Sequence, residues 1–240
     1  MRQIAALIAL CAAACSGSQS ADVNVSETFR PEDFVLMPCG IADAEAACAL
    51  AIAGGKRVLF GTPAGIGRSL EAGDLRQLDA VMVFSLRSAD LEGLDEVRNM
   101  SWRAGREAPL LVVGPEGTNT AVKALNHAFE QADALRIVDE GIPPGGYDAA
   151  ILTSRELGFG NEAQVGFDTG DLMIAGRVQA DGRVDYRISY AVDLVLSSCG
   201  VWLPDAESIS FDFEAGLACE TSDLPWPLSE HVMLFSLADG

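Results

Sequence analysis

The chain has 240 residues, of which 49% are hydrophobic, and its formal net charge is −19 at pH 7. This length and composition suffice for one buried core, and no composition shift inside the chain marks a second domain. Strong acidity and scattered basic residues exclude a phosphate backbone as partner, so nucleic acid is not expected. The solubility that a large net charge gives to an exported protein is sufficient to explain this acidity.

The N-terminus has the pattern of a secretory signal. Arg2 precedes the apolar run IAALIALCAAA (residues 4–14), which is too short to cross a bilayer as a mature helix. Small residues precede Cys15 and the flexible stretch SGSQS follows it, an arrangement that resembles the lipobox of bacterial lipoproteins. Ala12 stands where the lipobox usually has Leu, and ordinary signal-peptidase cleavage is the alternative. We therefore predict a signal peptide over residues 1–14, a lipidated Cys15 with a tether over 15–33, one domain over 34–240, and a periplasmic or outer-membrane lipoprotein.

Residues 34 to 113 alternate between strand and helix patterns. The run FVLMPCG (residues 34–40) predicts a strand, and ACALAIA-GG-KRVLFG predicts a hairpin whose turn is Gly54-Gly55. Such alternation indicates a sheet with covered faces. The other elements predicted here are a helix at Arg68–Leu75, a strand at Ala80–Leu86, a helix at Leu91–Ala104 and a strand at Leu110–Val113.

A long helix opens the second half of the chain, and strands follow it. From residue 118, the spacing of Val122, Leu125, Phe129 and Ala132 predicts a helix with one buried stripe. His127 falls outside this stripe and has no Cys or second His within one turn, so we expect a solvated side chain and not a metal ligand. The strands predicted after the loop GIPPGG are Ala149–Leu152, Asp171–Val178, Arg183–Tyr190, Val192–Ser198, Ser208–Phe213 and Val232–Leu237, with a hairpin turn at Asp181-Gly182. Two mixed sheets with helices outside are the expected architecture.

Four cysteines follow Cys15, namely Cys39, Cys48, Cys199 and Cys219. In an oxidising compartment an even number favours two disulfides, for which three connectivities exist. We favour Cys39–Cys48 and Cys199–Cys219 because the members of each pair are close in sequence. Zinc is the less favoured use of the four thiols, since the chain has no C-x-x-C spacing. A free buried thiol at Cys199 is a further alternative.

General catalytic motifs are missing from the sequence, which has no G-x-S-x-G elbow, P-loop, G-x-G-x-x-G after a strand, or H-E-x-x-H. Several stretches together nevertheless resemble metallo-β-lactamase-fold hydrolases, in the branch of RNase Z and arylsulfatase-type enzymes. They are KRVLFGTPAGIGRSL, LDAVMVFSLRSADLEGLDEVRNMSWRAGREAPLLVVGPEGT, VKALNHAFEQADALRI, GIPPGG, VDYRISY and VLSSCG. The resemblance covers residues 34–240 and implies a shortened four-layer αββα sandwich, of class α+β or α/β, with a metal site between the inner sheet edges.

The resemblance also locates the metal ligands of this family, and none of them is kept. Active members carry T-H-x-H-x-D-H after the strand that is here Ala80 to Phe84. Their three histidines fall on Ser85, Arg87 and Asp90, and their aspartate falls on Ala89. Further along, a histidine in H-G-x-V falls on Ala175, the bridging aspartate of S-G-D-T falls on Cys199, and the last histidine falls on Ser236.

A count of donors agrees with this comparison. Two divalent ions held by imidazole and carboxylate need several neutral nitrogens, about five in the pattern of the family that the chain resembles, whereas the chain has only two histidines, His127 and His231. A guanidinium at position 87 stays protonated and places positive charge beside the site meant for cations. We expect Arg87 to form an ion pair with Asp90 that closes the site.

The leading interpretation is therefore a protein of this fold without catalytic residues, metal or cofactor. It would act in the cell envelope as a binding or accessory module for an unidentified protein or small molecule and would reach the membrane only through its lipid anchor. The alternative is a hydrolase of ester, sulfate or phosphodiester bonds with one metal, such as zinc, held by Asp90, Asp168 or Asp171, and His231. A third possibility, a decayed product without function, is disfavoured by the intact strand patterns and export signal. The three tryptophans, Trp102, Trp202 and Trp226, are expected in the core.

Overall fold

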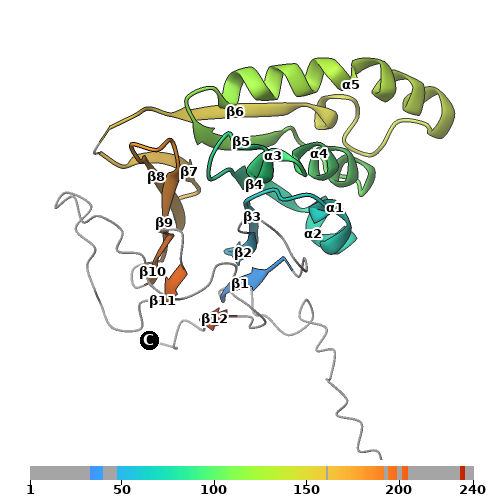
Figure 1. The fold of residues 1–240 in the computed structure, drawn as a ribbon. Helices are drawn as coiled ribbons and strands as arrows, with labels where there is room; N and C mark the ends of the chain where they lie inside the picture. Colours follow the sequence, from blue (N-terminus) through green and yellow to red (C-terminus); the bar gives the residue numbers. More distant parts are fainter. Residues whose placement is uncertain are drawn as a thin grey trace, which may run out of the picture.

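Two β-sheets face each other and enclose the main core (Figure 1). The computed structural model describes residues 33–39, 48–160, 162–191, 194–198, 202–204 and 233–235. The strands of the first sheet are β1 (Phe34–Pro38), β2 (Ala49–Ala53), β3 (Lys56–Phe60), β4 (Leu78–Met82), β5 (Leu110–Pro115), β6 (Leu152–Leu157) and β12 (Met233–Phe235). Those of the second are β7 (Gln164–Asp168), β8 (Leu172–Val178), β9 (Val184–Tyr190), β10 (Leu194–Ser198) and β11 (Trp202–Pro204). The helices are α1 (Ile66–Ser69), α2 (Ala72–Arg76), α3 (Ser88–Leu91), α4 (Leu94–Arg103), α5 (Thr118–Glu140) and the short 3-10 helix η2 (Asp148–Ala150).

The first sheet is mixed and has the order β12-β1-β2-β3-β4-β5-β6. Its first half is antiparallel, and the predicted hairpin at Gly54-Gly55 joins β2 to β3 with both glycines at positive φ. From β3 to β6 the strands run parallel, so the carboxyl ends of β4 and β5 meet at one edge of the sheet. The loops that follow these two strands therefore lie side by side, where α/β proteins usually place their sites.

The second sheet is antiparallel, in the order β11-β10-β9-β8-β7, and not mixed as expected from the sequence. Its inner face packs on the first sheet through alternate apolar residues of β8 and β9, among them Ile174, Tyr186 and Ile188. A β8–β9 hairpin does turn at Asp181-Gly182, as predicted. Strand β7 was not predicted, because its residues are partly exposed and lack a clear alternation.

Helices α1, α2, α4 and α5 pack on the outer face of the first sheet, over a second apolar cluster (Figure 1). The outer face of the second sheet carries no helix within the described ranges. The observed layers are thus helix, sheet and sheet, and the fourth layer of the expected αββα sandwich is not among the described residues.

Several predicted boundaries were wrong for identifiable reasons. The helix expected at Leu91–Ala104 divides at Gly93, whose N–H donates to the Thr62 carbonyl at 2.8 Å and where a side chain would collide with the Pro63 carbonyl. The helix expected at Arg68–Leu75 is two short helices, α1 and α2. Ala149 and Ala150, expected in a strand, form η2 and pack with the fully buried Trp102, and β6 begins only at residue 152. The strand expected at 208–213 lies outside the described residues.

The most buried charges join helix α4 to helix α5. The Arg98 guanidinium donates to both carboxylate oxygens of Asp133, at 3.2 and 2.5 Å, and the two side chains are 0% and 1% exposed. Asp133 therefore replaces Ala132, which is exposed, at the end of the stripe predicted for the long helix. Because both side chains are buried, the bidentate hydrogen bonds of the pair must offset the free-energy cost of desolvating two charges.

The predicted disulfide between Cys39 and Cys48 is present, with a Cα–Cα distance of 5.5 Å. It joins the end of β1 to the residue before β2, so it closes the connection between two paired strands. Cys199 and Cys219 lie outside the described residues. Among the described helices, none is long and apolar enough to span a bilayer.

We predict that Asp133→Ala lowers the free energy of unfolding by about 3–5 kcal/mol, because it leaves a guanidinium buried without its partner. Replacing both residues, in Arg98→Met/Asp133→Leu, should restore most of that loss. Glu130→Ala, which removes the exposed His127–Glu130 pair on the same helix, serves as control and should cost less than about 1 kcal/mol. Urea unfolding measures all three, and equal losses for Asp133→Ala and Glu130→Ala would contradict the assignment.

Candidate functional site

The loop after β4 is closed on itself by hydrogen bonds. The buried Ser85 hydroxyl donates to the Asp90 carboxylate, and the Arg87 N–H donates to the Ser85 oxygen at 3.1 Å. From the neighbouring loop, the buried Thr62 hydroxyl donates to the Asp90 carbonyl at 2.7 Å. Two of the positions that match family histidines, 85 and 90, thus bind each other.

Arg87 does not pair with Asp90, contrary to the prediction. Its guanidinium turns outward to the β8–β9 hairpin, where it lies 3.8 Å from the Asp181 carboxylate and donates to the Asp181 carbonyl at 3.4 Å. Both side chains are about half exposed, so the charge of Arg87 stays in water at low cost. The prediction failed because Ser85, buried beside the aspartate, is the nearer donor.

Tyr186 of β9 fills the space between the sheets directly behind this loop. Its hydroxyl is fully buried and lies 2.8 Å from the Val83 carbonyl and 3.1 Å from the Val113 carbonyl. Val83 directly follows β4, and Val113 lies within β5. Burial, together with the Asp90 charge, raises the pKa of Tyr186 well above its ordinary value of 10.0. The hydroxyl therefore stays protonated and donates to these carbonyls.

A backbone bond reinforces this junction. The Val184 N–H, at the start of β9, donates to the Phe84 carbonyl at 2.7 Å, so the second sheet is bonded to the residue just before Ser85. The Tyr186 ring also packs edge to face on Phe60 and Phe84. Sequence reasoning did not identify Tyr186, and only its place in the alternating VDYRISY strand could have suggested an inward direction.

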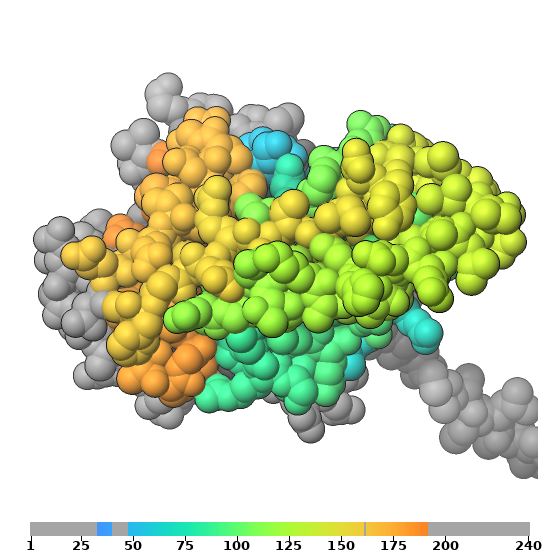
Figure 2. Space-filling view, turned by 90° about the horizontal axis from the view of Figure 1, so that it is seen from above, coloured from blue at the N-terminus to red at the C-terminus, as the bar shows by residue number. Residues whose placement is uncertain are grey.

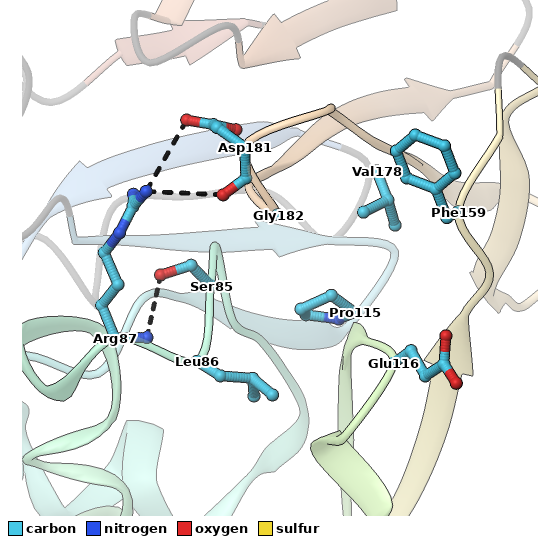
Figure 3. A pocket seen from close by; sticks show the side chains of 9 residues that line it. All are labelled: Ser85, Leu86, Arg87, Pro115, Glu116, Phe159, Val178, Asp181 and Gly182. Carbon is cyan, nitrogen blue, oxygen red and sulfur yellow. Dashed lines mark hydrogen bonds and ion pairs between the residues drawn. The ribbon is translucent and has the colours of Figure 1, made fainter.

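A cavity of about 320 Å³ lies outside this junction. Figure 3 shows Arg87 and Asp181 on one side of it and Phe159 and Val178 on the other, with Glu116 below Phe159. Its remaining lining residues are Ser85, Leu86, Pro115 and Gly182. The walls are mainly apolar with charges at the rim, which suits a small ligand with an apolar body.

The other predicted positions are not brought into this site. Ala89 lies in α3, while Ala175 of β8 alternates with core residues Ile174 and Leu172 and so faces the opposite side of the second sheet. Cys199 and Ser236 lie outside the described residues. His127 is exposed, as predicted, and pairs with Glu130.

The alternative single-metal set is not assembled either. Phe84, near Asp90, bonds to Val184 at one end of β9, whereas the Asp171 carbonyl bonds to the N–H of Ala191 beyond the other end. At about 3.3 Å per residue, these seven residues separate the two ends by about 23 Å. Asp168 lies in the same β7–β8 turn region as Asp171, and His231 is outside the described residues.

The side chains present do not fit a pair of divalent cations. The described residues contain no group of three or more His, Cys, Asp or Glu side chains that could hold a metal. Asp90 is the carboxylate at a matched ligand position in the loop after β4, and it already accepts the Ser85 hydroxyl. We therefore assign no metal-dependent reaction step to the described residues.

Similarity to solved structures identifies the architecture. The structure superposes on human tRNase Z, short form, with a TM-score of 0.50, 11% sequence identity, and 71% of each chain covered. The chain has the metallo-β-lactamase fold. Weaker matches are the metallo-β-lactamase-fold protein YhfI from Bacillus subtilis (TM-score 0.43, 14% identity, 66% of this chain and 58% of that one) and a diphosphatase from the PhnP family (0.42, 13%, 66% and 62%). No protein-family model and no curated protein matches the sequence.

Within the metallo-β-lactamase fold, the resemblance places the metal ligands in the loop after β4 and at the facing ends of the second sheet. In this chain the same region holds the Ser85–Asp90 bond, the Tyr186 hydroxyl and the Val184–Phe84 bond. Sequence reasoning did not identify these bonds.

We predict that Tyr186→Phe lowers the free energy of unfolding by about 1–3 kcal/mol, since the buried Val83 carbonyl loses the hydroxyl and the Val113 carbonyl keeps only the Val83 N–H. Because the folded pKa is raised, the wild-type chain keeps this contribution below pH 10 and loses it as pH rises toward the folded value. The variant should therefore lose less stability above pH 10. Tyr147→Phe, at a 39% exposed position, is the control, and urea unfolding at pH 7 and pH 11 gives the comparison. Identical pH dependence in wild type and Tyr186→Phe would contradict the role assigned to Tyr186.

Proposed function

We propose that this chain is an exported, lipid-anchored protein of the cell envelope that uses a metallo-β-lactamase fold for binding and not for hydrolysis. The single observation that carries the proposal is the closed loop after β4, in which the Asp90 carboxylate accepts the Ser85 hydroxyl. A ligand loop for cations must present free lone pairs to the cleft. In this chain the loop uses them to hold its own conformation.

The charges around the cavity support binding without metal. Arg87 lines it with a guanidinium group, so a cation in the same space would meet a positive charge. Asp181 offsets that charge from the hairpin opposite. Leu86, Pro115 and Val178 leave an apolar floor on which a small molecule, or a side chain of an envelope protein, fits.

The N-terminal sequence supports the location. A short apolar run followed by small residues and Cys15 suits export and acylation, and SGSQS suits a tether between lipid and domain. The Cys39–Cys48 disulfide fits an oxidising compartment. Removal of residues 1–14 leaves fifteen basic against 35 acidic residues, a charge of −20 that favours solubility at the membrane surface.

A metal-dependent hydrolase is the competing function, because the fold is hydrolase-like. The geometry gives it little support. Asp90 is separated from Asp168 and Asp171 by the length of the β9 strand, so any metal would need ligands from outside the described residues.

We expect protein purified without chelators to contain far less than one zinc, iron or manganese per chain, and to show no turnover of ester, sulfate, β-lactam or phosphodiester substrates. Elemental analysis by mass spectrometry measures the metal. Asp90→Asn tests the loop directly, and Glu92→Gln is a matched control on an exposed neighbour. Stoichiometric metal that is lost in Asp90→Asn and kept in Glu92→Gln, together with turnover, would establish the hydrolase instead.

We also expect the mature chain to begin at an acylated Cys15 and to sediment with membranes. Mass spectrometry of the N-terminal peptide identifies the lipid, and Cys15→Ser should move the protein to the soluble fraction. Wild-type protein that is soluble and carries an unmodified N-terminus would show ordinary signal-peptidase cleavage and remove the anchor from the proposal.

A further inference from the structure

Helix α5 carries a second apolar stripe on the side that faces away from the protein. Its buried side packs on β5 and β6 and on Arg98, through Val122, Leu125, Phe129 and Asp133. The opposite side has large apolar side chains in water, with Leu135 64% exposed and Val138 80% exposed. Ile142, just after the helix, is 65% exposed. Large apolar residues gathered on one exposed face commonly mark a site of interaction.

The stripe is regular along the helix. Ala124, Ala128, Gln131, Leu135 and Val138 are spaced by four, three, four and three residues. At about 100° per residue they fall within an arc of about 80°, and the buried residues fall on the far side. In Figure 2, which is seen from above Figure 1, α5 (yellow-green) crosses the front of the molecule.

This stripe is also free of charge, in a chain whose net charge is −19. Its five residues include no acid or base, and the nearest titratable side chains, His127 and Asp139, lie at its borders about 60° from Ala124. Electrostatic repulsion opposes contact between two such acidic chains over most of their surfaces. It is much weaker where the uncharged stripes meet.

The sizes of the side chains are complementary end to end. The N-terminal half of the stripe is small, with Ala124 and Ala128 and with Ala121 at its border about 60° from Ala124, and the C-terminal half is bulky, with Leu135 and Val138. A two-fold axis midway between Ala128 and Gln131 sets Ala124 opposite Leu135 of a second copy and Ala121 opposite Val138. Each bulky side chain then meets an alanine, whereas a parallel pair would set Leu135 against Leu135 and leave a gap along the alanines.

We propose that this stripe, residues 121–138 of α5, is a self-association surface on which a second copy of the chain packs antiparallel about a two-fold axis. The contact is isologous, so it closes as a dimer. The stripe is only about 26 Å long at 1.5 Å per residue, so the interface is smaller than a standard one. We therefore expect weak association, with a Kd in the micromolar range.

The test uses the whole mature chain with Cys15→Ser, so that acyl chains cannot drive association. Sedimentation should show a monomer–dimer equilibrium at micromolar concentrations. Leu135→Glu/Val138→Glu should raise the Kd by about 10-fold or more, because a charge is desolvated in each apolar layer. Val165→Glu/Met173→Glu makes the same change of charge at exposed apolar positions of β7 and β8 and should leave the Kd unchanged.

Cross-linking gives a second readout that keeps the stripe apolar. Gln131→Cys, next to the proposed axis, should form a covalent dimer on mild oxidation, and Lys123→Cys, on another side of α5, should not. This readout decides the matter if Leu135→Glu/Val138→Glu fails to fold.

Three results would overturn the proposal. They are a chain that stays monomeric at every concentration, a dimer that both glutamate pairs leave intact, and a monomer that binds phospholipid vesicles through Leu135 and Val138. The last result would identify a lipid surface as the occupant.

Discussion

The junction between the sheets at the ends of β4 and β5 constrains everything near the candidate site. Tyr186 brings a buried hydroxyl to the carbonyls of Val83 and Val113, and Val184 binds the Phe84 carbonyl next to them. Buried carbonyls need such donors, because water does not reach them. The second sheet is thereby held against the very residues that precede the loop of Ser85 and Asp90. A loop fixed in this way keeps one conformation without a metal to organise it.

This arrangement bears on the proposal that the fold is held at this point without metal ligands. In a metallohydrolase of this architecture, bound cations would tie the facing loops together through imidazole and carboxylate groups. Here the Ser85 hydroxyl binds the Asp90 carboxylate inside the loop after β4. The half-exposed Arg87–Asp181 ion pair and the Val184–Phe84 backbone bond join this region to the β8–β9 hairpin and to β9. The cavity beside these links is lined by charged residues as well as apolar ones, which bears on what the proposed binding site can hold.

The sequence predicted what depends on local pattern. Alternation and turn chemistry located the β2–β3 and β8–β9 hairpins. The sequence could not predict hydrogen-bond and ion-pair partners that depend on the three-dimensional arrangement of the chain. Arg87 seemed to belong with Asp90, three residues away, but Asp181 takes the guanidinium, and Ser85 takes the carboxylate. The predicted stripe ended at Ala132, whereas the buried residue is Asp133, which pairs with Arg98 of another helix. Tyr186 gave no signal of its bond to two strands of the opposite sheet.

The proposed lipid anchor and the proposed self-association surface on α5 bear on each other. An interface of this size is weak in solution, because translational freedom must be given up for a small buried area. Anchored chains have already lost much of that freedom, and their effective concentration in a membrane plane is high. Electrostatic repulsion between chains of charge near −20 opposes every approach except through an uncharged face. A two-fold contact also buries the stripe of both copies. The proposed surface therefore allows a dimer but leaves no free stripe for a third copy.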